Sequence, residues 1–347
     1  MVAAAQLGVL AACVVLFVPM GLAGWHLSRN KMLFFSGALF ITLAVGVHIA
    51  PYFPVASQFL ISTLTPSFSS SPPFRPFSCF SFLHDVSFLP LDSPSTFDWF
   101  PARSRSADCR FQKLSRSETG ELLNGSWILV AGDSQARLLV LALLRLLLDR
   151  SAMEAVEVDL FRRHSDYHTV ISELGMKLDF VWSPFESNIT SLLQRLRGGP
   201  RLPEVLVAGS GLWHMLHVNN ASDYGESLAS VRKSAASIVP PFSSGLAMQP
   251  PHMFWLGMPT LLNPMLNTEE KKVKMSRIIW EAYDQEVDDS GVLRSSGGSF
   301  VLLDIGSLSH NCGQQCTTDG MHYGGVVYEA ALQVMLNALL IESQQRI

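Results

Sequence analysis

The sequence predicts an α/β domain with a parallel central sheet, preceded by two helices that cross a membrane. From residue 126 onward, short apolar runs alternate with longer segments of helical pattern, which is typical of strands connected by helices. The short runs are apolar at consecutive positions, which indicates strands buried on both faces of a parallel sheet. The first 62 residues instead contain two long uncharged stretches, which predict the membrane helices.

The composition excludes two broad classes of protein. Of the 347 residues, 48% are hydrophobic and 16% are charged, and the mean hydropathy is +0.25. A disordered chain needs low hydropathy and abundant charge, so this class is excluded. The net charge of −4 does not supply the basic surface with which proteins coat nucleic acid. The positive hydropathy indicates that part of the chain lies in lipid.

The uncharged stretches cover residues 3–25 and 32–57. A helix needs about 20 apolar residues to cross the hydrocarbon core, so both stretches are long enough. The link between them carries Arg29 and Lys31, and the positive-inside rule places such a link in the cytosol and the following chain in a lumen. A cleaved signal peptide is the alternative, but it expects basic residues at the N-terminus, where this sequence has none. Residues 1–62 are therefore predicted to form a transmembrane hairpin.

Sequons and cysteines are consistent with a lumenal domain. Three Asn-x-Ser/Thr sequons follow the predicted spans, so Asn124, Asn188 and Asn220 are candidates for glycosylation. The cysteines after the spans are even in number, as expected of disulfides in an oxidising compartment: Cys79, Cys109, Cys312 and Cys316. Four cysteines allow three pairings, and the sequence does not choose among them. No CxxC pair is present and the histidine spacing does not suit zinc, so no metal site is predicted.

Residues 63–107 differ from both flanks because they consist largely of Ser, Phe, Pro and Leu. Prolines oppose both helices and central strands, so the segment is predicted to be a poorly structured stalk between the membrane and a domain at 108–347. These residue types have pyrimidine-rich codons, so an alternative origin of the segment is translated intron sequence.

The domain is expected to alternate strands and helices along the chain. The expected strands cover residues 127–131, 156–161, 178–182, 205–208, 253–256 and 300–304. The expected helices cover residues 135–148, 189–197, 223–239, 268–287 and 326–340. The helix at 135–148 is apolar nearly all round but too short for a membrane span, which predicts burial in the core.

Ligands of such sheets bind beyond the carboxyl ends of the strands. The first strand is followed by Gly132, Asp133 and Ser134 at the start of a helix, where free N–H groups and the helix dipole favour negative charge. Ser134 is therefore a candidate nucleophile. The alternative is that Asp133 or Ser134 only caps the helix.

A second candidate group follows the last strand. A serine needs a base, usually histidine, and that histidine needs a carboxylate to orient it. Asp319 and His322 lie three residues apart just before the final helix, at the same rim of the sheet as Ser134. An Asp-x-x-His pair alone is usually a solvated turn. Its occurrence together with Ser134 predicts a catalytic triad of these three residues.

Segments after two other expected strands are weaker candidates. The small residues Gly209 and Gly211 would let backbone N–H groups approach an oxyanion, or would form a simple turn with Trp213 in the core. His214 and His217 are alternative bases, although no acid is paired with them locally.

Basic and aromatic side chains complete the candidates. Arg162 and Arg163 belong to a polar cluster with His164, Asp166 and His168, which suits either a polar substrate or a solvated loop. Three tryptophans are expected in the core rather than as sugar-stacking platforms: Trp182, Trp255 and Trp280.

The motifs resemble a known group of proteins. Gly132-Asp133-Ser134 with Asp319-x-x-His322 is similar to the SGNH/GDSL hydrolase superfamily, and more narrowly to its PC-esterase branch, which includes the trichome birefringence-like proteins. The segments that carry the resemblance span most of the chain: GVLAACVVLFVPMGLAGWHLSRNKMLFFSGALF, LLNGSWILVAGDSQAR, DLFRRHSDY, GLWHMLHVNNASD and CTTDGMHY. Typical superfamily members have an asparagine as oxyanion donor in the third block, where this chain has Gly209-Ser210-Gly211.

The resemblance implies a three-layer α/β/α fold and a Golgi membrane protein that O-acetylates xyloglucan and xylan. Ser134 would carry the acetyl group, His322 would be the base and Asp319 would orient it. The acetyl donor would be acetyl-CoA or an acetylated carrier, with no other bound cofactor. The expected partners are wall polysaccharide, the membrane and other Golgi acetylation proteins, and not nucleic acid. An acetyl-esterase and a non-catalytic scaffold of an acetylation complex are the alternatives.

Overall fold

The computed structural model describes residues 84, 86–90, 97–101, 111–238 and 250–345. The expected transmembrane hairpin at 1–62 lies outside these residues. So do Cys79, Cys109 and the Ser/Phe/Pro-rich run at 67–83. The structural statements below concern the described residues.

The core of the domain is a six-stranded sheet with the order β4-β5-β3-β6-β7-β8. Every neighbouring pair is parallel except β4 and β5, which are antiparallel. The strands are β3 (Trp127–Gly132), β4 (Tyr167–Ile171), β5 (Met176–Trp182), β6 (Val205–Ala208), β7 (His252–Leu256) and β8 (Val301–Leu303). Numbered along the chain, the five parallel strands have the doubly wound order 2-1-3-4-5, whose direction reverses between β3 and β6.

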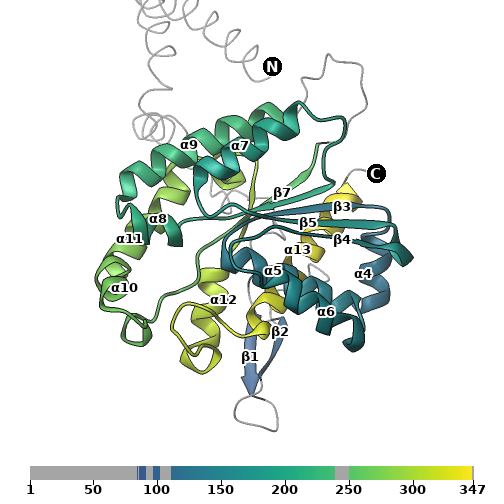
Figure 1. Cartoon of the computed structure of the whole chain (residues 1–347), viewed down its shortest axis with the longest axis horizontal. Helices are drawn as coiled ribbons and strands as arrows, with labels where there is room; N and C mark the ends of the chain where they lie inside the picture. The colour runs from purple at the N-terminus through teal and green to yellow at the C-terminus, as the bar shows by residue number, and fades with distance from the viewer. Residues whose placement is uncertain (1–83, 85, 91–96, 102–110, 239–249, 346–347) are drawn as a thin grey trace, which may run out of the picture. The chain divides into compact units, whose positions relative to one another are not determined.

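Helices cover both faces of the sheet, so the fold has three layers (Figure 1). One face packs against α4 (Arg116–Leu122), α5 (Ser134–Leu147), α6 (Arg150–Leu160), α12 (Ile305–Cys312) and α13 (Gly325–Gln345). The other packs against α7 (Glu186–Arg197), α8 (Leu212–His217), α9 (Ala221–Ile238) and α11 (Arg277–Asp289), and α10 (Glu269–Lys274) contacts α8.

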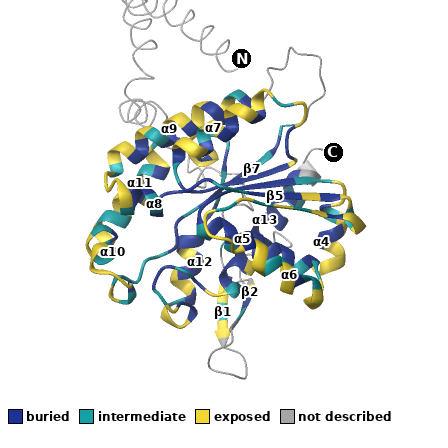
Figure 2. Cartoon of the chain, in the orientation of Figure 1, coloured by how far each residue is buried: buried dark blue, intermediate teal, exposed yellow. Residues whose placement is uncertain are grey.

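Successive residues of each central strand pack against opposite layers. In β3, Ile128 and Val130 join the core of the α5 face, whereas Leu129 and Ala131 join the core of the α7 face. All four are buried, which explains why the strand is apolar at every position (Figure 2). The expectation of a mostly parallel sheet buried on both faces is therefore confirmed.

The expected strand at 156–161 is wrong, because these residues belong largely to α6. Asp149 caps this helix by accepting a hydrogen bond from the amide of Ala152, at 2.8 Å. The helix buries Met153 and Leu160 and leaves Val158 exposed to solvent. The segment was expected to be a strand as one of the short apolar runs, but the cap and the spacing of the buried residues favour a helix. The strand in this part of the sheet is the antiparallel edge strand β4, which was not expected.

The expected single helix at 268–287 is broken into α10 and α11. Asn263 donates its side-chain N–H to the carbonyl oxygen of Lys272 at 2.6 Å and to that of Met275 at 3.4 Å. These carbonyls would otherwise accept from the next helical turn. Met275 is buried at the break, so a tertiary contact ends α10 where the local sequence would continue it.

Part of the expected stalk is a structured hairpin. Strands β1 (Val86–Pro90) and β2 (Phe97–Pro101) pair antiparallel, and they pack against α12 and α13. Trp99 is fully buried in the core of the α5 face, with its ring edge-on to Phe111. The two prolines lie at strand ends, where they interrupt no central ladder. The expectation of a poorly structured chain is therefore wrong for these residues.

One helix among the described residues is long and apolar enough to cross a membrane. It is α13, over Gly325–Glu342, and 72% of that stretch is buried inside the protein. It packs against α5 and α12, as a core helix of a doubly wound domain does.

We predict that Trp99→Ala destabilises the protein by about 3 kcal/mol or more, because it empties a buried aromatic site. Phe100→Ala is the matched control, since Phe100 is the next residue of β2 and is exposed. Urea unfolding of the purified chain, followed by circular dichroism, measures both. Equal, small losses in the two variants would show that the hairpin does not pack on the domain.

Candidate active site

Ser134 lies where the sheet reverses its winding direction. It is the first residue of α5, directly after β3, and Asp133 caps the helix by accepting a hydrogen bond from the amide of Gln135 at 2.9 Å. A Cβ atom on Gly132 would lie 2.7 Å from the carbonyl oxygen of Gly209, so this close approach of β3 and β6 requires glycine. The helix starts here because Asp133 satisfies an N–H group of the first turn.

Asp319 and His322 are held together by a compact loop before α13. The Oδ1 atom of Asp319 accepts hydrogen bonds from the amides of Met321 and His322, at 2.9 and 2.7 Å. Thr317 donates its hydroxyl to the carbonyl oxygen of His322 at 2.8 Å and accepts from the amide of Gly320 at 3.1 Å. The loop therefore orients the imidazole through its backbone and its side chains.

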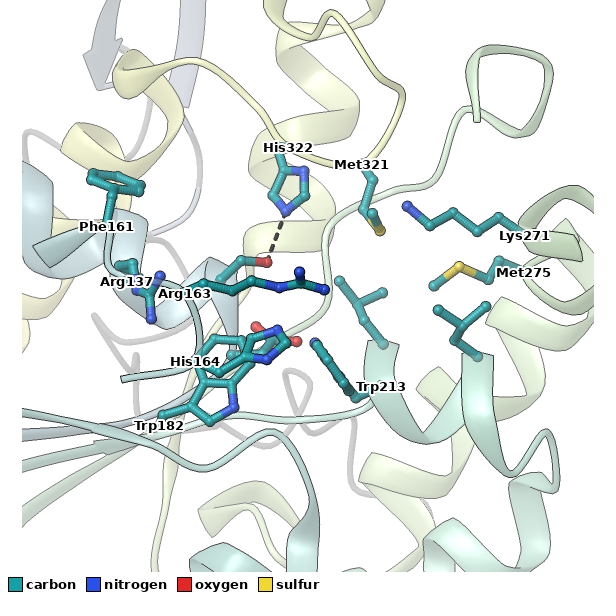
Figure 3. A pocket seen from close by; sticks show the side chains of 14 residues that line it. Arg137, Phe161, Arg163, His164, Trp182, Trp213, Lys271, Met275, Met321 and His322 are labelled. Carbon is teal, nitrogen blue, oxygen red and sulfur yellow. Dashed lines mark hydrogen bonds between the residues drawn. The ribbon is translucent and has the colours of Figure 1, made fainter. Parts of the chain in front are cut away.

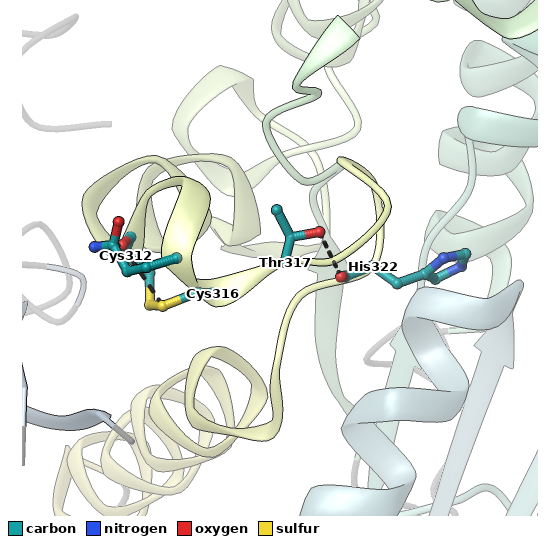
Figure 4. Close-up of a disulfide and its surroundings, with 5 residues drawn as sticks. Cys312, Cys316, Thr317 and His322 are labelled. Carbon is teal, nitrogen blue, oxygen red and sulfur yellow. Dashed lines mark hydrogen bonds between the residues drawn. A yellow bond between two sulfur atoms is a disulfide. The ribbon is translucent and has the colours of Figure 1, made fainter. Parts of the chain in front are cut away.

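A disulfide lies immediately before this loop. Cys312 at the end of α12 is bonded to Cys316, which precedes Thr317 (Figure 4). The amide of Gly324 donates to the carbonyl oxygen of Cys316 at 2.6 Å, which closes the loop. Of the pairings that the sequence left open, the structure has the one that joins Cys312 to Cys316.

The structure brings the three expected triad residues together. The hydroxyl oxygen of Ser134 lies 2.8 Å from Nε2 of His322, the contact drawn as a dashed line in Figure 3. Nδ1 of His322 lies 2.7 Å from Oδ2 of Asp319. A carboxylate only accepts hydrogen bonds, so Nδ1 carries the proton and Nε2 is free to accept the proton of Ser134.

The electrostatics of the loop keep Asp319 ionised. Burial disfavours its charge, but the hydrogen bonds from the imidazole and amide of His322 and from the amide of Met321 outweigh burial and lower the pKa of Asp319. An ionised Asp319 can support the positive charge that forms on His322 when Ser134 loses its proton.

Asp133 behaves in the opposite way. Its side chain is buried, and this burial raises the pKa of Asp133 to about 6, although the amide of Gln135 and the nearby His322 favour the charged form. From the sequence, Asp133 was expected only as part of a motif or as a helix cap. In the structure it also lines the pocket of Ser134.

Ser134 and His322 open into a pocket of about 340 Å³ (Figure 3). The lining residues are mainly aromatic, apolar and basic: Asp133, Ser134, Arg137, Phe161, Arg163, His164, Trp182, Leu212, Trp213, Leu216, Lys271, Met275, Met321 and His322.

An aromatic wall forms one side of this pocket. His164 stacks on Trp182 with ring centroids 4.8 Å apart, and Trp213 meets Trp182 edge-on at 5.6 Å. Trp182 packs partly buried against the core, as expected, and it also lines the pocket. Trp255 is fully buried as expected, and Trp280 lies partly buried in a separate cavity. Trp213, which one of the two alternatives for its segment placed in the core, lines the pocket.

The two candidate arginines differ in position. Arg163 lines the pocket, whereas Arg162 lies in an exposed ion pair with Asp159 at 3.1 Å and does not line it. Two pocket residues, Arg137 and Lys271, were not among the residues expected from the sequence. Arg137 could have been found, because it lies three residues after Ser134 on the same face of α5. Lys271 is distant in sequence from every motif, and only the fold places it there.

The oxyanion candidates are less favourable than expected. The amide of Gly209 donates to the carbonyl oxygen of Ala131 at 3.1 Å, so it is not available to a ligand. Gly211 begins α8 with φ of +128°, a conformation that requires glycine. The amide of Ser134 lies in the first turn of α5, whose N–H groups have no partner within the helix.

The alternative bases do not reach Ser134. His214 is buried, with Nε2 at 3.0 Å from Asp223 and Nδ1 at 2.9 Å from the hydroxyl of Tyr283. The acid paired with His214 is Asp223, which lies nine residues further along the chain. Both nitrogens are occupied, so His214 is not a base for Ser134. His217 is exposed beside Trp213, with ring centroids 5.0 Å apart.

The three sequons lie at exposed positions. Asn124 follows α4, Asn188 lies in the first turn of α7, and Asn220 precedes α9. Their glycosylation stays a prediction.

The geometry defines a class. A doubly wound α/β sheet with a serine after its first parallel strand, and an Asp-x-x-His loop before its last helix, is the arrangement of the SGNH/GDSL-like proteins. The chain is 49% identical over 371 aligned positions to the Arabidopsis thaliana protein "Protein ALTERED XYLOGLUCAN 9", and the alignment covers 99% of this chain and 100% of that protein. The protein therefore belongs to the Altered Xyloglucan branch of the SGNH/GDSL-like PC-esterase family. No family model matches the sequence.

Solved structures with a related outline are more distant. A structure titled as that of TesA is 17% identical, with a TM-score of 0.33, and the match covers 63% of this chain and 98% of that one. A catalytic mutant of Axe2, an acetylxylan esterase from Geobacillus stearothermophilus, is 10% identical with a TM-score of 0.36, over 66% and 96% of the two chains. These TM-scores are too low to support a functional argument.

We predict that Asp133→Asn stabilises the protein at pH 7.5. The pKa of Asp133 is raised to about 6 in the folded state from an ordinary 3.8, so the folded state loses stability as pH rises between these values. Above about pH 6 the loss is about 3 kcal/mol, and below about pH 4 it disappears. The asparagine oxygen can still cap α5.

Thermal unfolding between pH 4 and 8 measures this effect. The control is Asp149→Asn, because Asp149 caps α6 at an exposed position and hydrogen bonds to the amide of Ala152 and the hydroxyl of Ser151 lower its pKa. This control should not be stabilised at pH 7.5. A variant of Asp133 that follows the wild-type pH profile throughout would contradict the prediction.

Proposed function

We propose that the protein is a polysaccharide O-acetyltransferase, or an acetyl-relay enzyme, that works through an acetyl-serine at Ser134. The observation that carries the proposal is the hydrogen-bonded chain from Ser134 to His322 to Asp319, with distances of 2.8 and 2.7 Å. The name of the Arabidopsis relative points to xyloglucan as the polysaccharide, and the family resemblance extends this to xylan.

In the first step the Ser134 oxygen attacks the carbonyl carbon of the acetyl donor. The hydroxyl proton passes to Nε2 of His322, and the imidazolium is supported by Asp319. The tetrahedral intermediate places its oxyanion near the amide of Ser134 at the start of α5, where the helix dipole favours negative charge. The bond to the leaving group then breaks, and His322 gives the proton to that group.

In the second step a sugar hydroxyl attacks the acetyl-serine. His322 takes the proton of this hydroxyl, and it returns the proton to Ser134 when the ester bond to the serine breaks. The products are an O-acetylated sugar and the free enzyme, so the reaction needs no further reactant.

Water can replace the sugar in this step, and the protein would then be an esterase. The pocket supports transfer, because apolar and aromatic side chains surround the serine and disfavour bulk water: Trp182, Leu212, Trp213, Met275 and Met321. The same aromatic wall offers flat faces for a sugar ring.

We further propose that the domain faces the lumen of the Golgi from a membrane anchor at residues 1–62. Three features support this location: the two apolar stretches, the exposed sequons, and the disulfide between Cys312 and Cys316, which persists in oxidising compartments. The lumenal domain then consists of residues 108–347 together with the hairpin formed by β1 and β2.

We predict that Ser134→Ala abolishes formation of an acetyl-enzyme and lowers turnover by roughly a thousandfold or more. Ser151→Ala is the control, because Ser151 lies in the first turn of α6 and its hydroxyl donates to Asp149 at an exposed site. Peptide mass spectrometry after incubation with an acetyl donor detects the acetylated serine. If Ser134→Ala is still acetylated at another residue and its turnover is unchanged, the triad mechanism is wrong.

We predict that xyloglucan oligosaccharide diverts the acetyl group from water to sugar. The full chain is incubated with acetyl donor and increasing oligosaccharide, and free acetate and acetylated sugar are measured together. Transfer predicts that acetylated sugar rises while acetate falls. Acetate that stays constant, with no acetylated sugar, identifies an esterase. No product of either kind, with no acetyl-serine, identifies a scaffold.

A further inference from the structure

Three basic side chains from separate elements converge on the pocket of Ser134. Arg137 comes from α5, Arg163 from the loop after α6, and Lys271 from α10. Figure 3 shows the guanidinium of Arg163 and the amino group of Lys271 pointing into the pocket from opposite sides. Asp133 is the one acidic side chain among the lining residues, and it is buried. The pocket therefore has an excess of positive charge.

The lysine in the pocket is the unpaired one of its helix. On α10, Lys272 pairs with Glu269 and Lys274 pairs with Glu270, each at 2.7 Å. Lys271 has no ion pair within the part of the chain that the structure describes. The helix thus neutralises the lysines outside the pocket and leaves the lysine inside it free to meet a ligand.

The loop after α6 repeats this pattern. Arg162 pairs with Asp159, whereas the adjacent Arg163 has no ion pair among the described residues and lines the pocket. The next residue, His164, has φ of +56°, which is uncommon for a residue other than glycine. Its ring stacks on Trp182, so the pocket wall stabilises the conformation that presents Arg163.

Arg137 supplies an independent indication of a ligand. Its side chain is 6% exposed and lies over the rings of Phe180 and Trp182, at 5.1 and 5.0 Å. Its Nη2 donates to the carbonyl oxygen of Ser165 at 3.3 Å, but its Nε has no hydrogen-bond partner in the described structure. A buried guanidinium with an N–H that has no acceptor is costly, and an anionic ligand in the adjoining pocket would offset part of this cost through its charge.

We propose that the pocket takes an acetyl donor whose leaving group carries phosphate, and that Arg163 and Lys271 bind this phosphate. The inference rests on the acetyl-serine mechanism proposed above and names the class of its donor. Three cations match a multiply charged phosphate better than the single carboxylate of an acidic sugar. The leaving group and the sugar occupy the same side of the acetyl-serine in turn, so the phosphate departs before the acceptor enters.

The test compares two donors that have the same thioester. Acetyl-CoA carries phosphates and an adenosine, and S-acetylpantetheine is the corresponding thioester without either; S-acetyl-4′-phosphopantetheine, which keeps one phosphate and lacks the adenosine, is measured beside them and should lose activity in the same variants. Acetylation of Ser134 in the full chain is followed by mass spectrometry, and kcat/KM is measured for each donor. We expect Arg163→Ala and Lys271→Ala each to lower the ratio of kcat/KM for acetyl-CoA over S-acetylpantetheine about tenfold, with a larger loss in the double variant.

Neighbouring cations supply matched controls. Arg162→Ala and Lys272→Ala remove the same charge from the same segments outside the pocket, so the donor ratio should not change. Equal loss in these controls would indicate only a general effect of surface charge. A wild-type ratio near one would overturn the proposal, because the phosphates would then contribute nothing.

Binding separates failure of this inference from failure of the acetyl-serine mechanism. Calorimetric titration of the wild type and the double variant with CoA needs no catalysis. CoA binding that is lost in the double variant, without acetylation of Ser134, would refute the mechanism and support the phosphate site. Acetylation of Ser134 from both donors without CoA binding would support the acetyl-serine mechanism and refute the phosphate site. An oligosaccharide with glucuronic acid that binds through Arg163 and Lys271, where CoA does not, would assign the charges to an acidic acceptor instead.

Discussion

The contact between the Ser134 hydroxyl and the His322 imidazole is the interaction on which the site depends. The two residues are 188 positions apart, so no local preference brings them together. They meet because β3 occupies the point where the winding direction of the sheet reverses, which leaves a crevice at the carboxyl ends of β3 and β6. Gly132 lets these strands approach closely there, because any side chain at that position would collide with the backbone at Gly209.

The other half of the site is built locally. Asp319 accepts hydrogen bonds from two amides of its own loop, and Thr317 donates to the carbonyl oxygen of His322. The acid and the base are therefore oriented by contacts within the loop, without any contribution from Ser134. The disulfide that ends at Cys316 joins this loop to α12. A short sequence spacing thus ensures the pairing of acid with base, and the sheet ensures the pairing of base with nucleophile.

Several features of the pocket cost stability. Asp133 is buried with a raised pKa, and His164 has a backbone conformation that is uncommon outside glycine. Within the described ranges of the chain, Arg137 has an N–H without an acceptor. The two lysines of α10 outside the pocket, Lys272 and Lys274, are by contrast satisfied by ion pairs. Proteins commonly concentrate such exceptions at functional sites, and here they surround the candidate nucleophile.

The local sequence was sufficient to predict the strands that are buried on both faces of the sheet. Most central strands could be predicted because they are short runs of mainly apolar residues. The triad could be predicted because its residues follow strands or precede the last helix. The segment at 156–161 was mistaken for a strand because it was taken as a short apolar run, whereas its buried residues Met153 and Leu160 have helical spacing. The β1 and β2 hairpin was not predicted because the composition of the segment suggested a stalk. In the structure, Trp99 of this hairpin is buried in the core.

The sequence by itself determined the kind of fold and the chemistry of the candidate site, because apolar runs and reactive residue types are local properties of a chain. The tertiary structure alone decided which basic and aromatic side chains share the pocket. Arg162 and Arg163 are adjacent, yet only Arg163 enters, and Lys271 arrives from a helix whose end is set by Asn263. Such choices depend on where elements distant in sequence come into contact, and no single segment of the chain contains that information.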